Sequence, residues 1–407
     1  MLITSGQPSL NPRLVKEADI LCSSGFDVTV LYQYWNEWGS VMDEPLLSGR
    51  SWKAIRVGGH PRTGRFKYWQ SRIVHRIAQF LVHKLQLNDG LAELALSRSS
   101  RDLQRKAKRI KASLYIAHNL GALPAAVFAA ETNKAKCAFD AEDFHRQEIS
   151  DDCNSMAYRL SKFIEDKYLT KVNYCTAASP LIAQAYQTLY SSLGIKVINN
   201  VFPSSSLQQV TSASPHGQLD LFWFSQTIGK GRGLEDAIAA LGMLKKNHIN
   251  LVLLGSIDDH TKSYFLSLAT NLGIDHKQLT FLSPVSPDQV FEIANKCDLG
   301  LALEQDRPHN RNICLTNKIF TYLTAGLAVI ATETLAQKGF IDQHPDIGRS
   351  FPIGDVEKLA LIIRDYDQDR AALYQTRLRS LQLAKEHFNW ETEGKKFISI
   401  VKETVEF

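Results

Sequence analysis

The segment 316–332 constrains the fold of this chain more than any other stretch. Thr316 is a suitable N-cap, and the apolar residues after it recur at helical spacing. Gly326 tolerates the left-handed conformation that ends a helix, and the apolar run 327–331 is typical of a strand buried on both faces. The segment predicts a helix–strand unit of a nucleotide-binding sheet, whose helix N-terminus beside Lys318 suits a diphosphate. A packed helix without a ligand would show much the same pattern.

The same alternation of strand, polar loop and helix recurs along the 407 residues. It predicts an α/β fold with two doubly wound, Rossmann-like domains that face each other across a cleft. Residues 204–218 are rich in Ser and Gln without periodicity, which predicts a linker. The expected domains are 1–203, joined by a C-terminal helix within 388–407, and 219–387. Residues 32–64 are expected to be rich in loops.

Three loops of the second domain should meet at the carboxyl ends of parallel strands, where such sheets bind ligands. The loop 225–233 has three glycines, Lys230 and Arg232, so backbone N–H groups and a guanidinium could hold phosphate. A flexible surface turn would have the same composition. Backbone groups at Ser283 and Pro284 could hold a flat base. The third loop leads into the helix start described above.

Polar side chains also follow the strands of the first domain. These are Asn11, Arg13, His118, Asn119, Glu142, Asp143 and His145. A lone histidine is usually structural, but three such loops from one sheet favour a site at that edge. We find no set of residues with metal-ligand spacing, and we expect no metal site.

The basic residues are concentrated in one part of the chain. Between Arg50 and Lys111 there are sixteen Lys and Arg against three acids, a net charge of +13, which leaves −8 for the rest of a chain of net +5. A helix expected over 68–87 has an aromatic and aliphatic stripe flanked by cations, as in helices that lie on anionic bilayers. The same stripe would also fit the core face of a buried helix. Nucleic acid is a weaker partner, because no recognised binding motif accompanies the charge.

The remaining features favour a cytoplasmic protein, peripheral on the inner face of the membrane if the basic region binds lipid. The N-terminus lacks a charged region followed by a long apolar segment, so we expect no secretory signal. No window approaches 18 uninterrupted apolar residues. The six cysteines lie far apart, which favours a reducing compartment.

Several motifs resemble one family, the GT-B glycosyltransferases, and most nearly the family 4 retaining enzymes. The resemblance covers nearly the whole chain. It is carried by the helix start Gly-Arg-Gly-Leu-Glu at 231–235, the segment 316–332, the late Phe-Asn-Trp-Glu at 388–391, and the stretches 9–13, 118–126, 139–145 and 199–203.

The resemblance implies a retaining, metal-independent transfer of a sugar from a nucleoside-diphosphate sugar, with no other cofactor. The acceptor would be a saccharide or lipid-linked saccharide in cell-surface polysaccharide synthesis, and a uridine diphosphate sugar is the first expectation for the donor. His118 would lie near the reacting sugar, and Arg232 would grip the diphosphate. The implied donor contacts are Gln226, Lys230, Gly231, Ser283, Pro284, Thr316, Asn317, Lys318 and Thr321. The implied acceptor contacts are Asn11, Arg13, Asn119, Glu142, Asp143 and His145.

The chain departs from the family pattern at three positions. Gln226 stands where a basic residue is usual, and Ile313 and Thr321 replace the glutamates of the E-x7-E motif. A threonine can still hydrogen-bond a ribose hydroxyl, but the lost charge-assisted bond costs on the order of 1 kcal/mol. Two alternatives therefore remain: a catalytically impaired binding or partner subunit, and a nucleotide-sugar epimerase.

Overall fold

The structure, a computed structural model, describes residues 1–85, 87–210 and 217–406. The chain divides into two compact units, which we call the first and second units. The first unit comprises Met1–Asn199, Pro308–Asn310 and the chain from Gly394 onward. The second comprises Asn200–Arg307 and Arg311–Glu393. Of the expected linker 204–218, residues 204–206 form a short 3-10 helix, and 211–216 lie outside the described residues.

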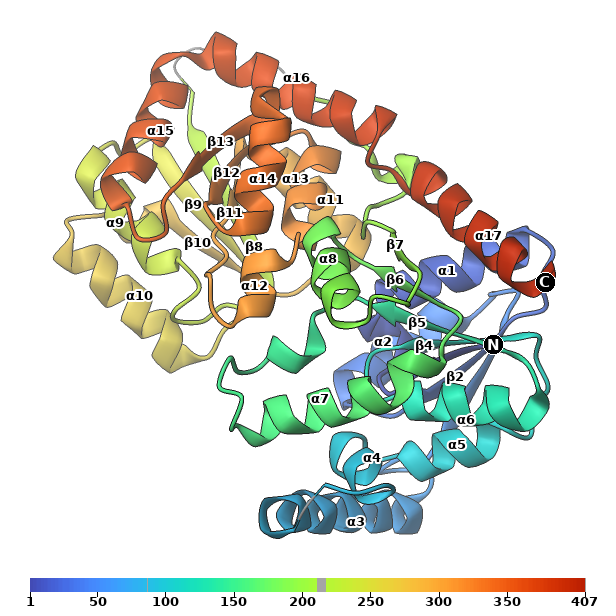
Figure 1. Cartoon of the computed structure of the whole chain (residues 1–407). Helices are drawn as coiled ribbons and strands as arrows, with labels where there is room; N and C mark the ends of the chain where they lie inside the picture. The colour runs from blue at the N-terminus through green and yellow to red at the C-terminus, as the bar shows by residue number, and fades with distance from the viewer. Residues whose placement is uncertain (86, 211–216, 407) are drawn as a thin grey trace. The chain divides into compact units, whose positions relative to one another are not determined.

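The first unit is built on a parallel sheet of seven strands in the order β3-β2-β1-β4-β5-β6-β7. Figure 1 shows α1 and α6 on opposite faces of this sheet. The strand order reverses between β1 and β4, as expected for a doubly wound fold. The strands are β1 (Leu2–Thr4), β2 (Thr29–Gln33), β3 (Lys53–Val57), β4 (Leu114–His118), β5 (Lys136–Ala141), β6 (Tyr174–Ala177) and β7 (Ile195–Val197).

Eight α-helices precede the linker within the described residues. They are α1 (Pro12–Ser23), α2 (Glu37–Leu47), α3 (Arg65–Lys84), α4 (Leu91–Leu96), α5 (Ser100–Ala107), α6 (Leu123–Asn133), α7 (Met156–Tyr168) and α8 (Pro180–Leu189). The prediction that 32–64 is rich in loops was wrong, because this segment contains α2 and β3. Gly39 and Pro45 interrupt the apolar pattern of α2, and most side chains of the edge strand β3 are at least partly exposed. Neither element therefore shows a clear periodicity.

The second unit contains a parallel sheet of six strands in the order β10-β9-β8-β11-β12-β13. The strands are β8 (Leu219–Thr227), β9 (Ile249–Ser256), β10 (Leu279–Leu282), β11 (Leu299–Ala302), β12 (Ala328–Thr332) and β13 (Gly348–Phe351). The helices are α9 (Leu234–Leu244), α10 (Asp259–Asn271), α11 (Pro287–Asn295), α12 (His309–Ile313), α13 (Asn317–Ala325), α14 (Leu335–Gln343), α15 (Val356–Gln368), α16 (Arg370–Glu386) and α17 (Trp390–Glu406). The residues of α12 are divided between the units after Asn310, and those of α17 are divided after Glu393.

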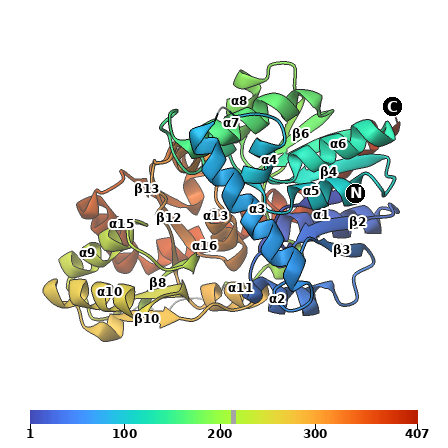
Figure 2. The same ribbon diagram turned by 90° about the horizontal axis from the view of Figure 1, so that it is seen from below.

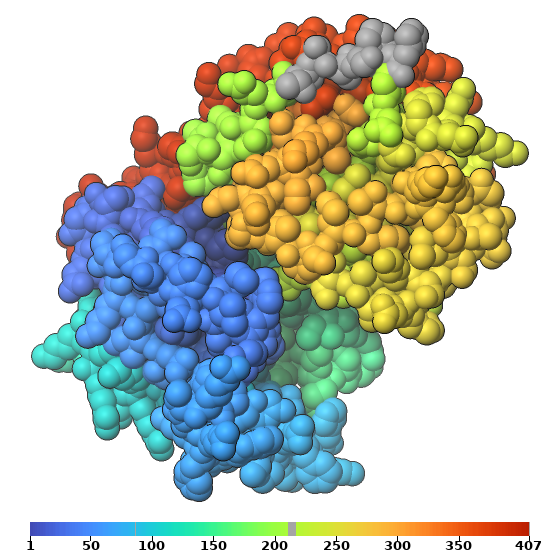
Figure 3. Space-filling view, turned by 180° about the vertical axis from the view of Figure 1, so that it is seen from behind, coloured from blue at the N-terminus to red at the C-terminus, as the bar shows by residue number. Residues whose placement is uncertain are grey.

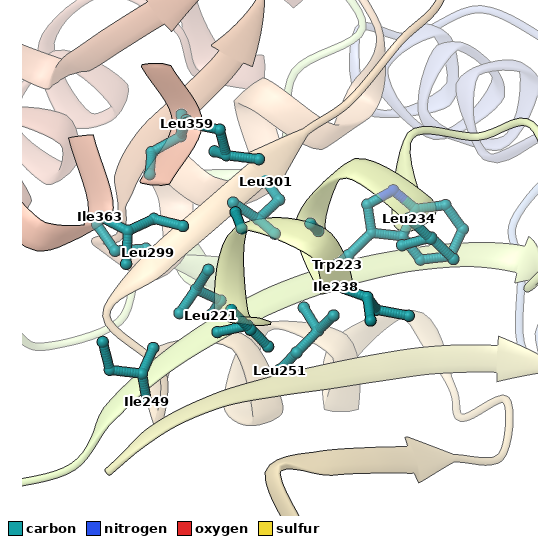
Figure 4. Close-up of a cluster of buried hydrophobic side chains, with 14 of the residues drawn as sticks. Leu221, Trp223, Leu234, Ile238, Ile249, Leu251, Leu299, Leu301, Leu359 and Ile363 are labelled. Carbon is teal, nitrogen blue, oxygen red and sulfur yellow. The ribbon is translucent and has the colours of Figure 1, made fainter. Parts of the chain in front are cut away.

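Apolar side chains from strands and helices form one core in the second unit. Leu221 and Trp223 of β8 pack with Ile238 of α9 and Leu301 of β11, and all four are almost completely buried. Figure 4 shows these side chains between the strands and the covering helices. This core fixes the strand ends from which the loops of the candidate site emerge.

The helix–strand unit predicted from the sequence is present. Helix α13 follows the N-cap Thr316 and ends at Gly326, whose φ is 68°. Strand β12 is buried along its whole length. The expected capping bond of Thr316 is absent: its hydroxyl forms no hydrogen bond to the first turn, and among the described residues its buried Oγ1 has no partner. The prediction was therefore right about the helix boundaries and wrong about that hydroxyl.

No helix in the described ranges is both long and apolar enough to cross a membrane.

Candidate functional site

The candidate site of the second unit lies where the strand order of its sheet reverses. Strand β8 comes first in the sequence of this unit, and it pairs with β9 on one side and β11 on the other. Loops that follow β8 and β11 therefore diverge from two adjacent strands. In open α/β sheets, this opening at the carboxyl edge is where ligands bind.

A small cavity of ≈ 80 Å³ occupies this position. It is lined by Trp223, Arg232, Leu303, Glu304, Gln305, Arg311 and Lys318. Trp223 comes from β8, Arg232 from the loop before α9, and Glu304 from the loop after β11. Lys318 lies in the first turn of α13. With Arg311 of α12, residues from five parts of the chain thus meet at one strand edge.

The glycine-rich loop holds Arg232 at the cavity. The Arg232 guanidinium donates to Ser225 Oγ at 2.8 Å, and the Gly231 N–H donates to Glu235 Oε1 at 3.1 Å. Gly233 has a φ of 76°, and a Cβ at this position would come within 2.7 Å of the Leu303 Cβ. Only glycine fits here without strain, because both the left-handed backbone and the close approach to Leu303 exclude a side chain. The loop is therefore packed against the end of β11.

Lys318 and Glu304 form the closest ion pair of the cavity, with 2.5 Å between Nζ and Oε1. Burial raises the pKa of Glu304, but Lys318, Arg311 and Arg232 together lower it below its usual value. The carboxylate is therefore ionised at neutral pH. Three cations surround this one acid, so the four side chains have a net charge of +2. A net charge of +2 next to the start of a helix complements a diphosphate group.

The cavity contains only two of the residues that were implied as donor contacts or as diphosphate ligands, Arg232 and Lys318. The exposed Lys230 lies over the Tyr264 ring, with 3.8 Å from Nζ to the ring centroid. Thr321 is buried within the unit. The other implied donor contacts outside the cavity include five exposed residues, Gln226, Gly231, Ser283, Pro284 and Asn317. These positions, and Thr316 at the start of α13, do not line the cavity as described.

Sequence reasoning missed Arg311, Glu304 and Trp223 as parts of the site. Arg311 lies in the short helix α12, whose polar sequence His-Asn-Arg-Asn-Ile has no periodic pattern. Glu304 lies two residues after the end of β11. The signal that could have found it is an acid at the carboxyl end of the strand that follows the reversal of strand order.

In the first unit, His118 lies in a buried cluster of charged side chains. The Arg13 guanidinium donates to both oxygens of Asp140, with two distances of 2.7 Å. His118 lies between two acids, with 3.1 Å from Nε2 to Glu17 Oε2 and 3.3 Å from Nδ1 to Asp140 Oδ2. All four side chains are fully buried. Arg13 and His118 therefore contact other protein groups rather than solvent.

Burial and the neighbouring charges shift the pKa values of the acids and of His118 in this cluster. Burial lowers the pKa of His118, but Glu17, Asp140 and Glu142 raise it well above its usual value. The pKa of Asp140 is lowered, since Arg13 and His118 outweigh the effect of burial. Burial and the charge of Asp140 raise the pKa of Glu17, although His118 and Arg13 act in the opposite direction. Pairing with Arg13 and His118 allows Asp140 to remain charged in the interior.

The same cluster contains the one group of potential metal ligands among the described residues, namely Glu17, His118 and Asp140. The Arg13 guanidinium already donates to both oxygens of Asp140, so this carboxylate is paired with a cation of the protein itself.

The other residues implied as acceptor contacts differ in environment. Asn11 caps α1 by accepting from the Leu14 N–H at 2.9 Å, and Asn119 donates to Thr4 Oγ1 at 2.9 Å. Glu142 is partly exposed near His118. Burial, followed by the charge of Glu148, raises the pKa of Asp143 to about 6. His145 lies 2.8 Å from Glu148, measured from Nδ1 to Oε2.

A larger hollow of ≈ 620 Å³ lies in the first unit beside α7. Its lining includes Arg159, Lys162 and Lys167, with Asp166 and Asp89 close by. Lys162 and Lys167 already pair with those acids. The residues implied as acceptor contacts are absent from its lining, so its size alone does not make it the site.

Comparison with known proteins identifies the fold class. No protein-family model matches the sequence, and no curated protein sequence does either. Among solved structures, the chain is similar to a sucrose-phosphate synthase from Thermosynechococcus elongatus, with 12% identity, a TM-score of 0.70 and coverage of 99% of this chain and 98% of that one. The two parallel sheets and this similarity give the chain the GT-B fold of glycosyltransferases.

Two further solved structures are similar over nearly their whole length. One is HepE from Anabaena in complex with UDP-glucose, with 14% identity, a TM-score of 0.70 and coverage of 99% of both chains. The other is WaaG, a glycosyltransferase involved in lipopolysaccharide biosynthesis, with 13% identity, a TM-score of 0.64 and coverage of 97% of this chain and 98% of that one. At these identities, the similarity describes the fold.

Proposed function

We propose that this protein transfers a sugar from a nucleoside-diphosphate sugar and binds the donor diphosphate in the cavity of the second unit. The observation that carries the proposal is the group of Arg232, Arg311 and Lys318 around Glu304 at the carboxyl edge of the sheet. A net charge of +2 would stabilise the negative charge that develops on the departing nucleoside diphosphate. Solved structures of similar fold include HepE bound to UDP and to UDP-glucose, which supports a uridine nucleotide as the first donor to test.

The chemistry included in the proposal is a retaining transfer without a metal, to a saccharide or lipid-linked saccharide acceptor of cell-surface polysaccharide synthesis. Diphosphate charge can be neutralised by Arg and Lys side chains as well as by a cation. The three basic residues of the cavity support that arrangement. The anomeric configuration of the product tests the retaining outcome, and turnover in the presence of a chelator tests the role of metal.

The first experiment measures binding of uridine, guanosine and adenosine diphosphates by the shift in thermal unfolding midpoint, followed by calorimetry for the one that binds. One of the three should raise the midpoint, because a ligand that binds only the native state stabilises it. Arg232→Ala should weaken this binding at least about tenfold, since a charge-assisted contact to phosphate is lost. Arg364→Ala is the matched control, because Arg364 is an exposed arginine on α15 of the same unit. If no nucleoside diphosphate binds, the proposal is wrong.

A second candidate function is a binding or partner subunit that retains nucleotide binding without turnover. It is favoured by Ile313 and Thr321, which replace the two acids of the family motif and are both buried. Neither lines the cavity with Arg232. The two functions differ in one measurement, the release of nucleoside diphosphate from a panel of donor sugars with and without acceptors. Binding without release under every condition would favour the partner subunit, and epimerised sugar would indicate an epimerase.

A further inference from the structure

Helix α3 of the first unit has one buried face and one exposed face. Ala78 and Val82 point inward and are almost completely buried. His75 Nδ1 donates to the carbonyl oxygen of Leu94 in α4 at 2.6 Å. Figures 1 and 2 both show α3 on the outside of the first unit with α4 against it. The inner face therefore fixes the helix, and the outer face is left to solvent.

The outer face is apolar along nearly the whole helix. Its members recur at intervals of three and four residues, so they form one stripe. Their exposed fractions are 83% for Phe66, 58% for Trp69, 56% for Ile73, 53% for Ile77 and 61% for Phe80. The sequence alone is also compatible with this stripe as a core face, and these exposures exclude that alternative. A contiguous row of exposed aromatic and aliphatic side chains marks a surface that binds something.

The charge of α3 limits what that partner can be. The helix contains Arg65, Lys67, Arg72, Arg76 and Lys84 and no acid. Lys67 pairs with Asp102 at 3.0 Å, and the Arg72 guanidinium lies 5.8 Å from the centre of the Trp69 ring. Residues 50–111 as a whole have a net charge of +13. The partner must therefore be anionic and must also accept apolar side chains.

We infer that α3 lies flat on an anionic bilayer, with its stripe at the boundary between headgroups and acyl chains. A helix with basic residues flanking an apolar face binds in this way. A second copy of this chain fits less well, because two such helices would bring like charges together. A nucleic acid would neutralise the cations of α3, but the apolar side chains of Ile73, Ile77 and Phe80 would remain exposed to water. In Figure 3, the region of the first unit that contains α3 is coloured in shades of blue.

A leaflet rich in anionic lipids has a negative surface potential, which attracts the basic residues of α3. The inference concerns the first unit alone and extends beyond the proposed sugar transfer. Nucleotide binding in the second unit is a separate readout on the same variants. A failure of the membrane inference can therefore be distinguished from a failure of the proposed nucleotide binding.

The test is sedimentation of the full chain with vesicles of phosphatidylcholine alone or with about 30% phosphatidylglycerol. The protein should bind the mixed vesicles, bind the neutral ones much less, and be released by about 0.5 M salt. A charge variant combines Arg65→Gln, Arg76→Gln and Lys84→Gln. A stripe variant combines Trp69→Ser, Ile73→Ser and Ile77→Ser. Each should lower the vesicle partition coefficient at least about tenfold, because both the charges and the apolar side chains contribute to binding.

Matched controls change the same number of exposed residues elsewhere. The charge control combines Lys245→Gln, Lys358→Gln and Lys385→Gln, and the stripe control combines Leu189→Ser, Met243→Ser and Leu335→Ser, all at exposed positions. Both controls should bind vesicles as the wild type does, and all variants should keep wild-type nucleoside diphosphate binding.

Three outcomes overturn the inference. The first is equal binding to neutral and anionic vesicles, or binding to neither. The second is loss of binding in the control variants to the same extent as in the α3 variants. The third is self-association in solution that the stripe variant abolishes, with no vesicle binding by the wild type, which would make α3 an interface between copies of the chain.

Discussion

Arg13 and Asp140 form a buried, two-point ion pair in the first unit, with Nε–Oδ2 and Nη2–Oδ1 both at 2.7 Å. Arg13 Nη1 also donates to the Ile198 carbonyl oxygen at 2.5 Å. The pair therefore ties α1 to β5 and to the chain just after β7. This geometry makes Arg13 a residue that holds the unit together, whereas the family resemblance implied a contact with the acceptor.

We predict that Arg13→Met lowers the free energy of unfolding by about 3–5 kcal/mol, because it removes the two-point ion pair that compensates most of the buried charge of Asp140. The control is Arg50→Met, which breaks the more exposed pair with Asp19. That change should cost less than about 1 kcal/mol. Urea unfolding of both variants checks the prediction, and equal costs would contradict it.

Arg311→Ala should weaken nucleoside diphosphate binding about tenfold to a hundredfold, because one of the three cations around the proposed diphosphate position is lost. Calorimetry measures the effect. The control is Arg307→Ala, an exposed arginine nearby in sequence that does not line the cavity. If the two variants bind alike, the cavity is not the diphosphate site.

Gly233→Ala should destabilise the second unit by about 1–3 kcal/mol and weaken nucleotide binding. The backbone there has a φ of 76°, and the new Cβ would lie 2.7 Å from the Leu303 Cβ. Gly354→Ala is a matched control, since Gly354 has a φ of 79° but no atom within 4 Å of a Cβ. The control should show the backbone strain alone and leave binding unchanged. Thermal unfolding and calorimetry separate the two effects.

The pair of His145 and Glu148 should make stability depend on pH. Burial lowers the pKa of His145, but the hydrogen bond and charge of Glu148 raise it overall, from 6.5 to about 9. The folded-state pKa is the higher one, so the stabilisation is complete below about pH 6.5 and is lost as the pH rises through about 9. Since Glu148 is partly exposed, we expect an effect on the order of 1–2 kcal/mol.

Two measurements check this pH dependence. The difference in unfolding free energy between wild type and Glu148→Gln should shrink as the pH rises across that window. The pKa of His145, followed by NMR titration, should fall in the variant. A pKa for His145 that is unchanged by Glu148→Gln would contradict the explanation.

Sequence patterns predicted those elements for which local conformational preference and tertiary packing favour the same structure. Helix α13, its end at Gly326 and the buried strand β12 follow directly from apolar periodicity and a left-handed glycine. Helix α2 was missed because Gly39 and Pro45 lie inside it, and tertiary contacts sustain it: Gln7 Nε2 donates to Asp43 Oδ2 at 2.8 Å. Such contacts leave no periodic signal in the chain.

The candidate site was only partly predictable for the same reason. Arg232 and Lys318 adjoin recognisable motifs, so their place at the strand edge could be anticipated. Arg311 reaches the cavity from a short helix without pattern. His118 follows a predicted strand, but the acids that surround it come from α1 and β5. The sequence shows which polar residues end strands. It does not show which charged side chains from other elements will surround them in the folded unit.

The position of β1 within its sheet has a consequence for the order in which the first unit folds. Strand β1 lies between β2 and β4, and its Thr4 is in register with His118. During synthesis, β1 can pair with β2 early, but its other edge stays open until β4 has been made. An unpaired strand edge is prone to mispairing, and long-range parallel pairing is slow. Strand β1 therefore gains its second neighbour only after the residues between it and β4 have been synthesised.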